Sequence, residues 1–76
     1  LALVKILCSP DERGEILPII KHFNSKTVDL TENSIIAMIH GDSEKVNAAI
    51  RLLSKFEIIE TVRTGKVVMA RGEATT

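Results

Sequence analysis

Residues 28–41 read VDLTENSIIAMIHG, and the rest of the chain has to fit around this stretch. Residues 34–40 are almost wholly aliphatic, too short for a helix of ordinary length and closed by Gly41, so they are predicted to form a strand buried on both faces. Residues 31–34 are turn formers whose side chains can satisfy nearby backbone groups. We therefore expect residues 28–31 to fold back antiparallel on residues 34–40. Because this hairpin offers no catalytic group, we expect the chain to act by binding.

The composition indicates one small globular domain. The chain has 76 residues, of which 45% are hydrophobic and 26% charged. A domain of this size buries only about 60–65% of its unfolded surface, so its stability is marginal. Ten acidic and ten basic side chains cancel, which argues against nucleic acid or an anionic membrane as a partner. No apolar run is long enough to span a membrane. The chain starts at Leu1 and enters a strand pattern at once, so we expect it to be a segment of a longer protein.

The remaining segments predict two more strands and two helices. Residues 1–8 are apolar on both alternating faces and predict a second central strand. Ser9, Pro10 and Glu12 form a helix start with a capping box, and this helix should end at residues 24–25. Pro18 lies inside it and is expected to bend it rather than break it.

A second helix follows the hairpin, with either Asp42 or Ser43 as its N-cap. Its apolar positions, at helical spacing between residues 46 and 56, mark one buried face. Residues 58–71 predict a last strand, in which Thr64 and Gly65 form either a tight turn or a bulge. The order strand, helix, strand, strand, helix, strand predicts an α+β, ferredoxin-like (ACT-like) βαββαβ sandwich, with both helices on one face of a four-stranded antiparallel sheet.

The chemically reactive side chains do not form a recognisable active site. His22, His40 and Cys8 are the only soft metal ligands, and no two lie at a spacing typical of a zinc site. Because Cys8 is the only cysteine, we expect a reducing compartment: the cytoplasm, or a plastid or mitochondrial matrix in a eukaryote. The carboxylates are explained by helix starts and strand ends, and the serines by caps and turns. The sequence therefore predicts no catalytic residue, no metal and no cofactor.

Two related functions of this fold are also disfavoured. RNA-binding modules stack bases on aromatic side chains of the central strands, and residues 34–41 contain none. Small phosphatases of this fold need an arginine-bearing, glycine-rich anion loop after the first strand, where residues 8–12 are acidic instead.

The sheet face away from the helices is predicted to be a self-association surface. If the alternate residues Ala2, Val4, Ile6, Cys8, Ile35, Ala37 and Ile39 face the helices, the other set would form an apolar patch. That patch would contain Leu1, Leu3, Leu7, Ile36 and Met38. Because so small a domain gains from covering it, we expect a homo-oligomer through the sheet or a docked domain.

Several segments resemble one family. Residues 28–34 followed by aliphatics to Gly41, and residues 63–72, RTGKVVMARG, look like the C-terminal domain of the small, regulatory subunit of acetolactate synthase. Residues 3–6 and 13–17 are similar to that family's first strand and first helix. The likeness covers nearly the whole chain. We therefore expect residues 1–72 to form this domain and residues 73–76 to be a disordered tail.

The resemblance implies a non-catalytic partner of the large, thiamine-diphosphate-dependent subunit that makes the first common intermediates of valine, leucine and isoleucine. In that family the feedback amino acid binds chiefly at an N-terminal ACT domain, so no effector residue is carried over. Pro18 and Glu57 depart from the family pattern. The alternatives are a free-standing ACT-like amino-acid sensor and a dimerisation module without a regulatory contact.

The last strand offers candidate residues for docking to the large subunit: Arg63, Gly65, Lys66 and Arg71. Arginines give planar, bidentate donors to carboxylates or carbonyl groups, while glycines let two backbones approach closely. The competing explanation is that an edge strand carries charge to deter pairing with other chains.

Overall fold

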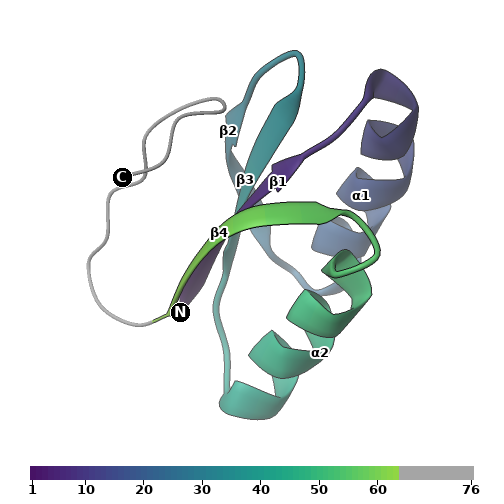
Figure 1. Cartoon of the computed structure of the whole chain (residues 1–76). Helices are drawn as coiled ribbons and strands as arrows, with labels where there is room; N and C mark the ends of the chain where they lie inside the picture. Colours follow the sequence, from purple (N-terminus) through teal and green to yellow (C-terminus); the bar gives the residue numbers. More distant parts are fainter. Residues whose placement is uncertain (64–76) are drawn as a thin grey trace.

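The computed structural model describes residues 1–63, which form a four-stranded sheet covered by two helices. The elements are β1 (Ala2–Leu7), α1 (Pro10–His22), β2 (Lys26–Leu30), β3 (Ser34–Ile39), α2 (Ser43–Leu53) and β4 (Glu57–Arg63). All strand pairs are antiparallel and the order is β2-β3-β1-β4. Both helices lie on the same side of the sheet (Figure 1). The ferredoxin-like fold predicted from the sequence is confirmed, with β1 and β3 as the central strands.

The central hairpin forms as its sequence predicts. β2 and β3 are joined by residues 31–33, and the backbone N–H of Thr31 donates to the carbonyl of Ser34 at 2.9 Å. The hydroxyl groups of the same two residues are 2.6 Å apart. The guanidinium of Arg13 in α1 donates to the carbonyl of Thr31, so the turn is also attached to the helix layer.

Helix α1 begins with the predicted capping box. The Ser9 hydroxyl accepts from the backbone N–H of Glu12 at 3.2 Å, and the Ser9 N–H donates to Glu12 Oε1 at 2.9 Å. The helix runs without interruption through Pro18 to His22. Beyond it, Asn24 has φ of 52°, a left-handed conformation that asparagine tolerates and that ends a helix.

Helix α2 is capped by Asp42, which decides between the two predicted caps. Asp42 Oδ1 accepts from the backbone N–H of Lys45 at 2.9 Å, whereas Ser43 is the first residue of the helix. The chain enters this cap through Gly41, whose φ of 142° is rarely adopted by residues with a side chain.

The hydrophobic core lies between the helices and one face of the sheet. The seven residues predicted to face the helices are all in it, with Cys8 directly after β1, and α1 contributes Ile16 and Ile20. From α2 come Val46, Ala49 and Leu53, while Ile58 of β4 packs against this cluster. The alternation predicted for β1 and β3 is therefore confirmed.

Candidate functional site

The predicted docking residues lie at and beyond the end of β4. Arg63 is the last residue of this edge strand and is paired with Ala2 of β1. Its Nη1 donates to Asn47 Oδ1 of α2 at 2.7 Å, and both side chains are exposed. Gly65, Lys66 and Arg71 lie outside the described residues, as do Thr64 and the predicted tail, residues 73–76. Of the predicted docking set, the structure therefore places Arg63 alone, beside α2.

The predicted self-association residues differ in how open they are. Leu1 is exposed, and Leu7 and Met38 are half-buried, but Leu3 and Ile36 are already buried within the single chain. Leu3 and Met38 are cross-strand partners, so these two are neighbours on this face, whereas Ile36 is paired with Lys5. The part of the patch that is open to a second molecule is smaller than the sequence alone indicates.

The same sheet face carries a row of charged residues that sequence reasoning did not identify. Lys5 is paired with Ile36 of β3 on one side and with Glu60 of β4 on the other, and Asp29 of β2 is paired with Ile36. These four residues form one row across the sheet. Lys5 is 0% exposed, so a positive charge is buried beside an acidic residue at the centre of the face.

Two irregularities place the acidic residues in this row. The pairing of β2 with β3 shifts between Thr27 and Asp29, and the pairing of β1 with β4 shifts between Lys5 and Ile6. Each shift leaves one extra residue in the edge strand, as in a β-bulge. In the sequence, the spacing of Asp29 and Glu60 from the apolar residues of their own strands was the available signal for these irregularities, and it was missed.

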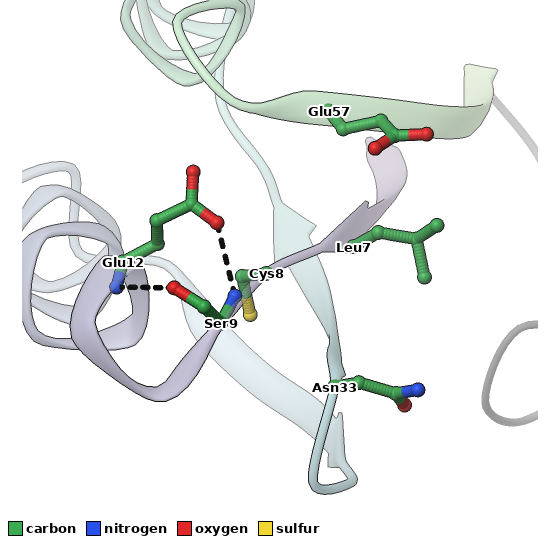
Figure 2. Close-up of a pocket in the computed structure, with 6 residues that line it drawn as sticks. All are labelled: Leu7, Cys8, Ser9, Glu12, Asn33 and Glu57. Carbon is green, nitrogen blue, oxygen red and sulfur yellow. Dashed lines mark hydrogen bonds between the residues drawn. The ribbon is translucent and has the colours of Figure 1, made fainter.

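A shallow pocket lies at the other end of β1, where this strand passes into α1 (Figure 2). Its volume is about 240 Å³, and it is lined by Leu7, Cys8, Ser9, Glu12, Asn33 and Glu57. Figure 2 shows that Ser9 and Glu12 are hydrogen-bonded to each other as the cap of α1. Cys8 is buried, and its backbone N–H donates to the carbonyl of Asn33 at 3.0 Å. Ser9 and Glu12 thus fix the helix start, and the backbone contact between Cys8 and Asn33 ties it to the hairpin turn.

The predicted absence of a metal site can be compared with the geometry of residues 1–63. Among these residues, no group of three or more His, Cys, Asp or Glu side chains is placed to hold a metal ion. The ring of His22 makes an edge contact with Phe23, with centroids 5.0 Å apart. Within the same range, no helix is both long and apolar enough to cross a membrane.

Comparison with known proteins identifies the family. A family model described as the small subunit of acetolactate synthase matches residues 1–72. The chain belongs to this family. The resemblance seen in residues 28–41 and 63–72 is thereby confirmed.

Members of the acetolactate synthase small-subunit family from distant organisms are similar to the chain. The probable small subunit of Archaeoglobus fulgidus is 40% identical over 72 residues, covering 95% of this chain and 45% of the relative. The small subunit of Bacillus subtilis is 42% identical, covering 95% of this chain and 42% of the relative. Small subunit 1, chloroplastic, of Nicotiana plumbaginifolia is 39% identical, covering 93% of this chain and 16% of the relative. The chain thus spans less than half the length of these relatives.

A solved structure of the family has the same fold. The crystal structure of the acetolactate synthase small subunit from Thermotoga maritima is 33% identical, with a TM-score of 0.77. The match covers 96% of this chain and 45% of that one.

Proposed function

We propose that this domain is the non-catalytic C-terminal domain of a regulatory subunit, which binds and modulates the thiamine-diphosphate-dependent catalytic subunit of acetolactate synthase in branched-chain amino acid biosynthesis. The observation that carries the proposal is the family match over residues 1–72. It is supported by the pocket at the start of α1, where Ser9 and Glu12 serve as the helix cap. The proposed partner is the catalytic subunit, and this chain contributes no cofactor of its own. A cytoplasmic, plastid or mitochondrial matrix location stays a prediction.

The contact proposed for the catalytic subunit includes Arg63, together with Gly65, Lys66 and Arg71. Arg63 is exposed, and Asn47 accepts a hydrogen bond from only one of its guanidinium nitrogens. Because a guanidinium has five N–H donors in a planar fork, donors remain for a carboxylate of the partner while Asn47 fixes the direction of the side chain. Lysine would supply a point charge without this geometry.

The test is Arg63→Lys in a regulatory subunit that contains this sequence as its C-terminal domain. We expect weaker activation of the catalytic subunit, measured as acetolactate formation at increasing regulatory subunit, with a nearly unchanged melting temperature, because an exposed polar contact adds little to folding. Unchanged activation would remove Arg63 from the contact. Loss of folding would show that its bond to Asn47 is structural instead.

The whole proposal has a separate control. If the unmodified regulatory subunit neither binds nor activates any catalytic subunit, while calorimetric titration of this domain with valine, leucine or isoleucine gives saturable heat, the amino-acid-sensing alternative replaces it. Acetolactate formation by this domain alone would contradict its non-catalytic role.

We also propose that the domain self-associates through the sheet face away from the helices. Leu1 is exposed there, and Leu7 and Met38 are half-buried. Covering these side chains would remove apolar surface from water, which stabilises by roughly 25 cal/mol per Å². The burial of Leu3 and Ile36 limits the gain, so we expect a weak association rather than an obligate one.

A further inference from the structure

The outer surface of α2 combines positive charge with an exposed apolar side chain. Asn47 and Arg51 of α2 are four residues apart and share the side of the helix away from the core, while Lys55 lies in the turn just beyond the helix, two residues after its last residue, Leu53. All three are exposed, and Leu52 beside them is 43% exposed. Arg51 has no ion pair with another residue in the range 1–63, and the Lys55 ammonium lies 5.9 Å from the ring centroid of Phe56. Together these residues form a basic surface with an apolar contact point.

This surface is continuous with the last strand. Figure 1 shows α2 leading through a short turn into β4, which runs back alongside it. At the far end of β4, Arg63 donates to Asn47 Oδ1, so its guanidinium adds a third positive charge to the end of this surface. Glu44, in the first turn of α2, and Glu57, two residues after Lys55 at the start of β4, are exposed acidic side chains at the two ends of this surface. Arg63, Arg51 and Lys55 therefore extend from Asn47 of α2 to the turn beyond the end of the helix, with Leu52 beside them.

We propose that the outer face of α2, made of Asn47, Arg51 and Leu52, together with Lys55 in the turn that follows, is one half of a docking surface whose other half is Arg63 and the end of β4. Its occupant is an acidic protein surface that offers carboxylates to the three cations and an apolar contact to Leu52. An eleven-residue helix is only about 16 Å long, whereas a stable interface covers roughly 800 Å² on each partner. Either half alone is thus too small for a stable interface. The hydrogen bond between Arg63 and Asn47 joins the two halves into one surface.

The identity of the partner rests on the proposed function, in which the acidic surface belongs to the catalytic subunit. Charge complementarity at the rim of an interface acts mainly on the association rate and on its dependence on salt. An exposed leucine acts differently, since the apolar area it loses does not depend on salt. The two kinds of residue on this surface therefore predict two separable effects.

The experiment measures binding of the regulatory subunit to immobilised catalytic subunit by surface plasmon resonance between low and physiological salt. Combined Arg51→Glu and Lys55→Glu changes should weaken binding by about fivefold to tenfold at low salt, through slower association, and flatten the salt dependence. Leu52→Ser should weaken binding with the salt dependence intact. The matched controls are on α1: Lys21→Glu, an exposed last-turn cation, and Leu17→Ser, a leucine that is 37% exposed.

The outcomes separate this inference from the proposed function. If the unmodified subunit binds and the α2 variants bind as well as the α1 controls, the α2 surface is overturned while the proposed function stands. If the unmodified subunit does not bind at all, the proposed function fails first. Salt-dependent binding of an oligonucleotide that is abolished by the Arg51 and Lys55 changes would overturn the acidic protein partner. Weaker binding supports the inference only if the melting temperatures of all variants are unchanged, because a misfolded helix would also lose binding.

Discussion

The capping box of α1 gives a prediction whose size follows from its geometry. Ser9→Ala removes the acceptor for the backbone N–H of Glu12, now 3.2 Å from the hydroxyl oxygen. Loss of such a cap costs about 1 kcal/mol of the free energy of unfolding. A chain of 76 residues is expected to have about 4–11 kcal/mol in total, so this one hydroxyl is a sizeable fraction. The melting temperature should fall by roughly 4–8 °C.

The assay is thermal and urea unfolding of the domain, followed by circular dichroism. Ser43→Ala is the matched control, because Ser43 follows the N-cap of α2 and the structure gives the capping role to Asp42. We expect this control to change stability by less than about 0.5 kcal/mol. Glu12→Ala should cost less when Ser9 is already alanine, since both side chains belong to one box. Equal losses for Ser9→Ala and Ser43→Ala, or fully additive losses for Ser9 and Glu12, would refute the reasoning.

Two further predictions concern the glycines and the sheet. Gly41→Ala should destabilise by about 1–3 kcal/mol, because φ is 142° and a Cβ would lie 2.6 Å from Cδ of Lys45. Gly14→Ala in α1, where an added Cβ would have no atom within 4 Å, should instead stabilise by roughly 0.5–1 kcal/mol; urea unfolding that gives both changes the same sign would contradict this. Met38→Glu should weaken self-association measured by sedimentation equilibrium. A stable, folded monomer that is insensitive to Met38→Glu would argue against the sheet as the contact.

The sequence predicts those parts of the fold whose causes are local. The hairpin of β2 and β3 follows from an aliphatic run next to turn formers, and the start of α1 follows from Ser9 and Glu12, three residues apart. The choice between Asp42 and Ser43 needed the structure, because both residue types cap helices well. The face assignments of β1 and β3 were predictable because a regular strand alternates with a period of two.

The candidate site was less predictable because its contacts join distant parts of the chain. Arg63 and Asn47 are sixteen residues apart and meet only because β4 runs back along α2. Helical spacing places Asn47 and Arg51 on one side of α2, but only the burial of Val46, Ala49 and Leu53 shows that this side faces outward. The positive charges at α2 and the end of β4 therefore read as two unrelated features in the sequence, and as one surface in the structure.

The charged row around Lys5 shows why both edge strands depart from regular pairing. Residues two apart on a regular strand point to the same face. A regular β4 could therefore not place Ile58 on the core and Glu60 on the opposite face at the same time. The shift between Lys5 and Ile6 solves this conflict: Ile58 pairs with Ile6 and packs on the core, while Glu60 pairs with Lys5 on the other face.

A register shift of the same kind occurs in β2. Thr27 pairs with Ala37, which belongs to the core, whereas Asp29, two residues on, pairs with Ile36 on the opposite face. An unpaired buried charge costs several kcal/mol, and Lys5 is 0% exposed. Each edge strand therefore carries one extra residue that brings an acidic side chain into the lysine's row, so the two irregular strands provide compensating negative charge on both sides of the sheet's central lysine.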